Sequence, residues 1–172
     1  MELLKEYVIQ FAGLSLGNHT YEFTLNHAFF EHFEASEIQK ADIRVALNLE
    51  KQERMMVFNF AINGTAEVPC DRCGDEFDIS ILGDEVLYVK YGTEYEEESE
   101  DILLIPPSEH QIDVSKFIYE YIHLLLPYQR LHPEDESGHS ACNPEALKKL
   151  EELRPASAEN ERWNVLKNIK LD

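Results

Sequence analysis

The chain has 172 residues, of which 44% are hydrophobic, so it is long enough and apolar enough to bury the core of one domain. Its formal net charge is −19, from 34 acidic and 15 basic residues, which excludes nucleic-acid binding through a broadly basic surface. Such a charge either steers basic partners toward the protein or serves solubility alone.

The sequence predicts a cytoplasmic protein. It contains no apolar run long enough to cross a membrane, and its first residues lack the basic start and long apolar stretch of a secretory signal. The three cysteines are an odd number, and a reducing compartment would keep them as thiols that can bind a metal. We therefore expect no disulfide framework.

Alternating apolar residues in the first half of the chain predict an antiparallel sheet. We expect its strands at residues 7–11, 21–25, 43–49, 54–62, 77–81 and 86–91. The first two strands would form an opening hairpin around the turn residues 13–18. Asn63-Gly64 and Gly83-Asp84 are dipeptides typical of tight turns, so we expect the chain to reverse at each of them.

An acidic run follows the last of these strands. Residues 94–101 contain six acids in eight positions, with no cations nearby in the sequence. A carboxylate site for Mg²⁺ or Ca²⁺ is the functional alternative, but the spacing of an EF-hand is missing. We expect a mobile, solvated loop.

Two helices are predicted in the second half. Asp113 can cap a helix with three-four apolar spacing that stops at Pro127, and this helix should cover one face of the sheet. Pro144 suits the first turn of a short helix that extends to Leu153. The fold class is thus α+β, with an antiparallel β-sheet or partial barrel that carries a CxxC knuckle and is covered by a few helices.

Residues 1–153 are expected to form this single domain, and residues 154–172 a linker and a short amphipathic basic helix. The tail has three-residue apolar spacing and the only clearly basic stretch of the chain. It either packs back on the domain or contacts RNA. The RNA-binding candidates are Arg162, Trp163, Lys167 and Lys170.

The most specific chemical signal is Cys70-Asp71-Arg72-Cys73-Gly74, which lies between two predicted strands. A CxxCG turn can direct two thiolates to one side, as in a zinc knuckle, but Zn²⁺ normally takes four ligands. His139 and Cys142 repeat the three-residue spacing downstream and would complete a Cys₃His tetrahedron. His132 is a reserve ligand.

Other interpretations of the same residues stay open. The cysteines could be small turn residues and a free thiol, with His132 and His139 simply exposed. A thioredoxin-like redox pair is weaker, because strands flank the two cysteines where a helix N-terminus is needed. Cys-His nucleophilic catalysis lacks both an identifiable oxyanion site and an orienting third group.

Taken in order, these features resemble one family. The chain resembles the YceD family in the order of its motifs. These are the Cys70-x-x-Cys73 pair, the acidic run, the helix that ends in Leu124-Leu125-Leu126-Pro127, then His132 and Cys142, and the closing Trp163-Asn164-Val165-Leu166-Lys167. Members of this family are associated with accumulation of the large-subunit ribosomal RNA. The resemblance therefore implies a role in ribosome biogenesis.

We expect a noncatalytic factor, not an enzyme, that supports accumulation or processing of large-subunit (23S) ribosomal RNA. Its partner would be a basic ribosomal protein or assembly factor held by the anionic surface, or the rRNA itself contacted through the tail. The alternative is a metal- or thiol-dependent enzyme that acts on RNA or a small molecule. That alternative needs an open position on the metal.

Overall fold

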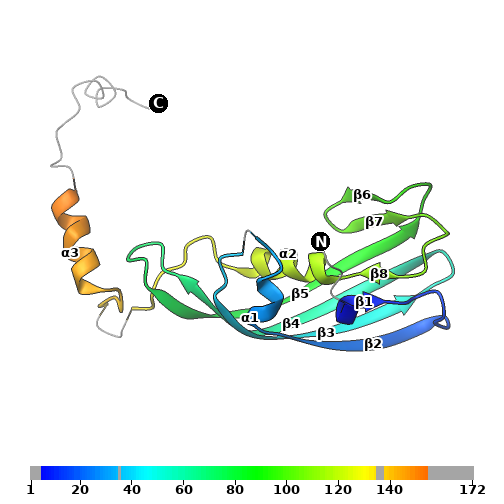
Figure 1. The fold of residues 1–172 in the computed structure, drawn as a ribbon, viewed down its shortest axis with the longest axis horizontal. Coiled ribbons are helices and arrows are strands. Elements are labelled where there is room, and N and C mark those ends of the chain that lie inside the picture. Colours follow the sequence, from blue (N-terminus) through cyan, green and yellow to red (C-terminus); the bar gives the residue numbers. More distant parts are fainter. Residues whose placement is uncertain (1–4, 35, 135–137, 155–172) are drawn as a thin grey trace, which may run out of the picture.

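The computed structural model describes residues 5–34, 36–134 and 138–154, and Figure 1 shows their arrangement. The elements are η1 (Lys5–Tyr7), β1 (Val8–Ile9), β2 (Gly17–Leu25), α1 (His27–Phe30), β3 (Lys40–Lys51), β4 (Met55–Pro69), β5 (Glu76–Tyr91), β6 (Glu96–Ser99), β7 (Ile102–Ile105), β8 (Ile112–Asp113), α2 (Ser115–Leu125) and α3 (Pro144–Leu153).

The main sheet has six strands in the order β2-β3-β4-β5-β7-β6. Neighbouring strands are antiparallel except for β5 and β7, which pair in parallel. The sheet is open, with β2 and β6 at its two edges. Of the two predicted alternatives, the β-sheet is therefore confirmed and the partial barrel is wrong. A few helices accompany this mostly β structure, as the predicted fold class requires.

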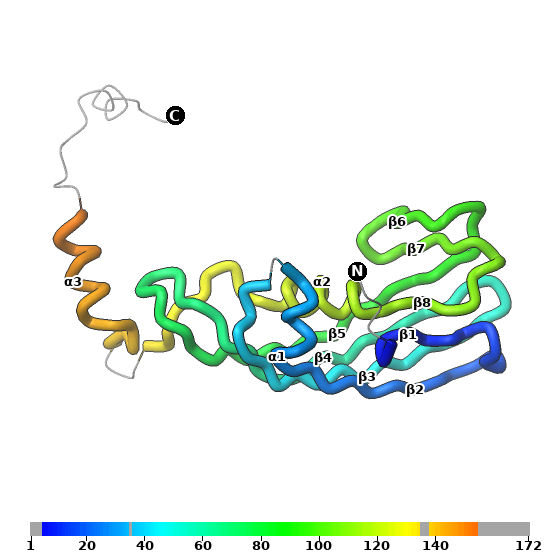
Figure 2. The backbone as a smooth tube through the Cα atoms, viewed as in Figure 1, coloured from blue at the N-terminus to red at the C-terminus, as the bar shows by residue number. Residues whose placement is uncertain are grey.

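The core lies on one face of the sheet. Burial alternates along β3 and β4, which places apolar side chains such as Leu47, Phe58 and Phe60 on the same side. Helices α1 and α2 cover this face in Figures 1 and 2, and their apolar residues join the same cluster. The covering helix is therefore confirmed, and the Asp113 carboxylate accepts a hydrogen bond from the Ser115 amide, 2.9 Å away.

The predicted opening hairpin is wrong. Strand β1 pairs with β8, and Val8 and Ile9 face Asp113 and Ile112. Ile9 and Phe11 are buried in the core cluster, so this segment lies over the face of the sheet and does not extend its edge. The Lys51 ammonium fixes the following loop by donating to the carbonyls of Phe11 (2.9 Å) and Leu14 (2.8 Å).

The two predicted turns at Asn63-Gly64 and Gly83-Asp84 are also wrong. Both dipeptides lie inside long strands: Asn63 and Gly64 pair with Leu82 and Ile81, and Gly83 pairs with Ile62. At Gly64 the neighbouring strand approaches so closely that a Cβ atom would lie 2.2 Å from the Asp42 carbonyl oxygen. The glycine thus permits close strand packing where a turn was expected.

The acidic run is partly a strand, not the predicted mobile loop. Residues Glu96–Ser99 form β6, which pairs with β7 in antiparallel orientation and contains a register shift between Glu97 and Ser99. All four residues are exposed. Charged side chains on an edge strand discourage pairing with other chains, which gives these acids a structural role.

The short helix predicted from Pro144 to Leu153 is confirmed as α3. Asn143 caps it by accepting hydrogen bonds from the amides of Glu145 and Ala146. No residue of α3 is buried, and the helix projects beyond the end of the sheet in Figure 1. The predicted basic tail lies outside the described residues.

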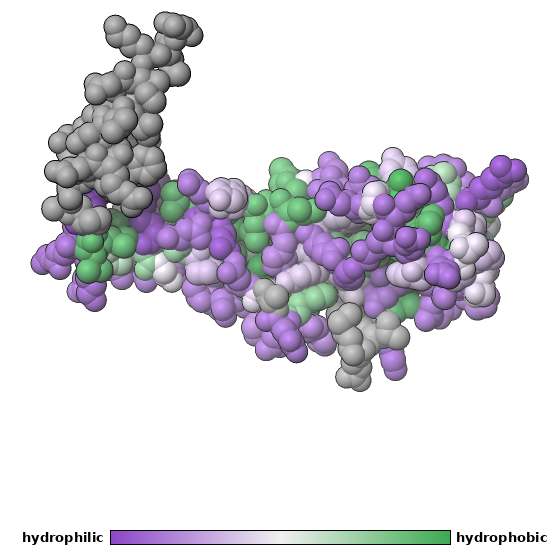
Figure 3. Space-filling view, turned by 90° about the horizontal axis from the view of Figure 1, so that it is seen from above, coloured by the Kyte–Doolittle hydropathy of each residue, from purple (hydrophilic) through white to green (hydrophobic). Residues whose placement is uncertain are grey.

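The surface viewed in Figure 3 is mostly hydrophilic, with small hydrophobic patches between the polar side chains. None of the helices within the described ranges is long and apolar enough to span a membrane.

Candidate metal centre

Three cysteines and one histidine meet at the end of the sheet from which α3 projects. Cys70 and Cys73 lie in the loop between β4 and β5, and His132 and Cys142 lie in the segment between α2 and α3. Their ligand atoms all lie within 4.8 Å of one another. The fold thus brings together two loops that are about sixty residues apart in sequence.

Pairing within the second loop explains which histidine joins the group. Glu134 and Ser140 form an antiparallel bridge, and the Ala141 amide donates to the Pro133 carbonyl at 3.2 Å. Continued by one step, this register sets His132 opposite Cys142. The residue held in reserve therefore lies at the site, whereas His139 is exposed and outside the cluster.

Three separations within this cluster suit one tetrahedral metal ion, and all four ligand atoms lie within 4.8 Å of one another. Zinc bonds of about 2.3 Å to sulfur and about 2.0 Å to nitrogen imply separations of about 3.8 Å between two sulfurs and about 3.5 Å between sulfur and nitrogen. The Cys70 and Cys142 sulfurs are 3.8 Å apart, and His132 Nδ1 is 3.5 Å from the Cys73 sulfur and 3.7 Å from the Cys142 sulfur. A disulfide needs about 2.05 Å, so these are free thiols spaced as metal ligands.

The site also favours deprotonated sulfur. Burial alone would raise the pKa of Cys70, but hydrogen bonds from the backbone at Cys73, Arg72 and His132 lower that pKa to about 6. The Arg72 amide donates to the Cys70 sulfur at 3.4 Å. At neutral pH this sulfur is therefore a thiolate, which is the form that binds metals.

This pKa gives a testable pH dependence in metal-free protein. Thiolate absorbance near 240 nm should rise in a step centred at about pH 6, because the amides stabilise the charged form of Cys70. The step should disappear in Cys70→Ser and remain in Cys142→Ser, because the pKa of Cys142 is raised. The contact of Cys142 with Ser140 lowers that pKa, but burial and the neighbouring sulfurs raise it by more. A first thiolate that forms only above pH 8 would contradict this assignment.

Contacts around the four side chains hold the two loops together. The Asp71 amide donates to the Arg130 carbonyl, and the Arg130 amide donates back to the Asp71 carboxylate, each at 2.8 Å. The Arg130 guanidinium contacts both Asp71 and Glu37. On the other side, the Asn143 amide group donates to Asp75 at 3.1 Å, which ties the start of α3 to the cysteine loop.

Support also comes from packing behind the ligands. The Phe77 ring lies 4.7 Å from the His132 ring, and Cys70 and Cys142 are both buried. Partners of this kind fix ligand orientation at metal sites. The four donor atoms and their surroundings could therefore hold a metal ion.

Comparison with known proteins identifies the family. The sequence model of a family described as "Large ribosomal RNA subunit accumulation protein YceD" matches residues 58–170, which is more than half of the chain. No curated protein and no solved structure shows a significant match. The matched region includes both cysteine loops, the covering helix and α3, and the chain belongs to the YceD family.

Proposed function

We propose that this chain is a noncatalytic, zinc-stabilised factor that supports accumulation or processing of large-subunit (23S) ribosomal RNA. The observation that carries the proposal is a complete four-ligand set, Cys70, Cys73, His132 and Cys142, in a member of a family named for that accumulation. When bound, zinc would supply no chemistry beyond cross-linking the two loops, because four protein ligands leave no position for water or substrate. The proposed role places the protein in the cytoplasm, where ribosomes assemble.

A thiol-dependent enzyme is the competing candidate, because the lowered pKa of Cys70 is also what a nucleophilic cysteine needs. The surroundings of the sulfur argue against it. Cys70 is only 3% exposed, and its sulfur faces Cys142, which leaves a substrate little access. The low pKa is therefore better explained by metal binding.

Two routes could link the protein to ribosomal RNA. One is direct contact through Arg162, Trp163, Lys167 and Lys170, which lie outside the described residues. The other is capture of a basic ribosomal protein or assembly factor by the acidic body. With a net charge of −19, the second route has the stronger electrostatic support.

The proposal is tested in cells that lack the gene. We expect their ratio of 23S to 16S rRNA to fall, and expression of the wild-type chain to restore it. Cys70→Ser with Cys73→Ser should restore it poorly and lower the amount of folded protein, since structural metal binding contributes to folding. Replacing the exposed His139 with alanine is the matched control, because this residue is outside the ligand set.

The outcomes separate the candidates. Normal 23S rRNA in the deletion strain would overturn the proposed function. A Cys70→Ser protein that is stable, folded and still inactive would favour the enzyme, because loss of a structural ligand must show itself in stability.

A further inference from the structure

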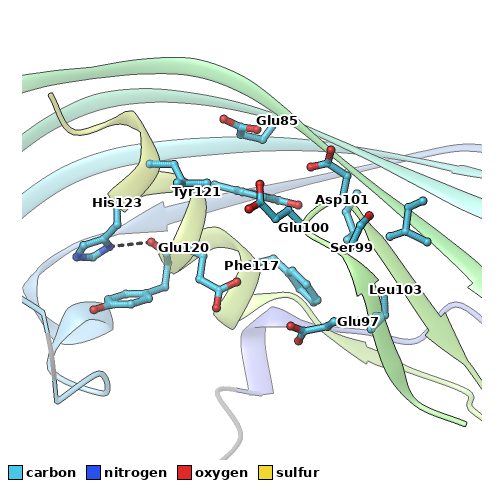
Figure 4. Close-up of a pocket in the computed structure, with 14 residues that line it drawn as sticks. Glu85, Glu97, Ser99, Glu100, Asp101, Leu103, Phe117, Glu120, Tyr121 and His123 are labelled. Atoms are coloured by element: carbon cyan, nitrogen blue, oxygen red, sulfur yellow. Dashed lines mark hydrogen bonds between the residues drawn. The ribbon is translucent and has the colours of Figure 1, made fainter. Parts of the chain in front are cut away.

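A second feature lies away from the cysteines, between α2 and the strands β5, β6 and β7. It is a cavity of about 590 Å³, within the range of ligand sites in proteins. Figure 4 shows its lining, with Phe117 and Tyr121 projecting from the helix and acidic side chains gathered on the opposite wall. Ile102 from the sheet and Leu124 from the helix complete an apolar floor.

The charges around this cavity are of one sign. Among the described residues, five carboxylates line it, and neither lysine nor arginine does. Nearby, Lys116 pairs with Glu97 at 2.6 Å and with Glu120 at 3.6 Å, so one end is partly neutralised. Within the described ranges of the chain, Glu85, Glu100 and Asp101 form no ion pair, so the other end keeps its negative charge.

An unpartnered polar group points toward that charged end. Tyr121 is 3% exposed, and its hydroxyl forms no hydrogen bond with any residue that the structure describes. In Figure 4 its ring extends from α2 toward Glu100 and Asp101. A buried hydroxyl without a partner costs free energy, and a ligand that supplies a hydrogen-bonding group would recover it.

We propose that this cavity binds an arginine-containing segment of a basic protein, with the guanidinium against Glu85, Glu100 and Asp101 and a neighbouring apolar side chain on Ile102 and Leu124. Guanidinium groups match carboxylates in both charge and geometry, and their five donors can serve several acceptors at once. The apolar floor suits the aliphatic stem and an adjacent hydrophobic residue. The inference deepens the proposed function, because it gives the basic partner a binding site.

The test uses the full chain and a defined probe. A fluorescein-labelled peptide of alternating arginine and leucine is titrated by fluorescence anisotropy at physiological ionic strength, beside the same peptide with neutral citrulline in place of arginine. We expect saturable binding of the arginine peptide only. Glu85→Gln with Asp101→Asn should weaken it at least about tenfold, since charge-assisted hydrogen bonds are lost.

A matched control removes the same charge elsewhere. Glu22 and Glu53 are exposed and outside the cavity lining, so Glu22→Gln with Glu53→Gln should weaken binding by less than about twofold. Tyr121→Phe removes only the unpartnered hydroxyl. It should weaken binding about fivefold without lowering the Tm, whereas a structural role of the hydroxyl would lower the Tm.

Several results would overturn the inference. If the two double variants weaken peptide binding equally, the peptide is attracted by the charge of the whole surface and not by the cavity. Tighter binding after replacement of Arg162, Lys167 and Lys170 by glutamine would mean that the chain's own basic tail occupies the cavity. If the protein forms a dimer that the peptide dissociates, a second copy of the chain occupies the cavity.

Failure of this inference is distinguishable from failure of the proposed function. If the peptide does not bind but deletion of the gene lowers 23S rRNA, the cavity assignment is wrong and the function stands. If deletion has no effect on 23S rRNA but the peptide binds as expected, the cavity is a basic-segment site that serves another process.

Discussion

Replacing His132 with alanine is expected to weaken zinc binding by at least about 100-fold, because a direct ligand should matter more than the outer partners whose loss costs 10- to 100-fold. His132 Nδ1 lies within 3.7 Å of two cysteine sulfurs, which is the spacing of a shared metal ion. His139→Ala should bind zinc as tightly as the wild type, because this exposed side chain is outside the cluster. Native mass spectrometry gives the stoichiometry, and competition with a chromogenic chelator gives the affinity.

The same pair of variants decides between two ligand sets. Loss of zinc in His139→Ala with retention in His132→Ala would reinstate the set chosen from the sequence spacing. If both histidine variants retain zinc and only Cys70→Ser loses it, the fourth ligand is a different residue. No zinc in the wild-type protein would remove the metal from the proposed function altogether.

Metal loss should affect one end of the molecule more than the other. The ligands join the β4–β5 loop to the segment before α3, whereas the apolar core lies between the sheet and helices α1 and α2. We therefore expect hydrogen exchange in chelated protein to accelerate first in residues 70–76 and in α3, with the central strands still protected.

The sequence was most informative where periodicity and capping agree. Helix α3 begins at Pro144 and ends at Leu153 as predicted, because an asparagine cap and a proline in the first turn define its start. Helix α2 was found from its three-four apolar stripe, although its N-cap is Val114 and not the predicted Asp113. These signals are local, so no tertiary information is needed to interpret them.

Turn residues were misleading because tertiary packing overrode their local preference. Asn63-Gly64 is typical of a hairpin, yet Phe60, Ile62, Ala66 and Val68 keep one alternating face on both sides of the glycine. That unbroken phase indicates one long strand. The same holds in β5, where Ile81 and Leu87 remain in phase across Gly83. Phase continuity is therefore the signal that could have corrected both predictions.

The cluster of three cysteines and one histidine was only partly predictable. The CxxC spacing marked Cys70 and Cys73, but His139 was favoured over His132 because it repeats the three-residue spacing with Cys142. The bridge between Glu134 and Ser140 sets His132 opposite Cys142. Pairing within the loop, and not spacing along the chain, therefore decides which histidine joins the cluster. Register of this kind depends on how the loop folds, and the linear sequence does not encode it visibly.

Gly64→Ala is expected to destabilise the protein by about 3 kcal/mol, a large effect for a single methyl group. The new Cβ would lie 2.2 Å from the Asp42 carbonyl oxygen and 2.6 Å from the Ile43 Cα. Both atoms belong to the backbone of β3, so no flexible side chain can move aside, and the two strands must separate. For a domain of this size the Tm should fall by about 6 to 12 °C, measurable by differential scanning calorimetry.

Gly13→Ala is the matched control, since a Cβ at that position would meet no atom of the described residues within 4 Å. It should change the Tm by no more than about 2 °C in either direction, as expected for a surface substitution. If both variants behave alike, β3 and β4 are not in close contact at Gly64. The Asn63-Gly64 dipeptide could then form the turn that its sequence favours, and the long central strand would be the part of the fold to revise.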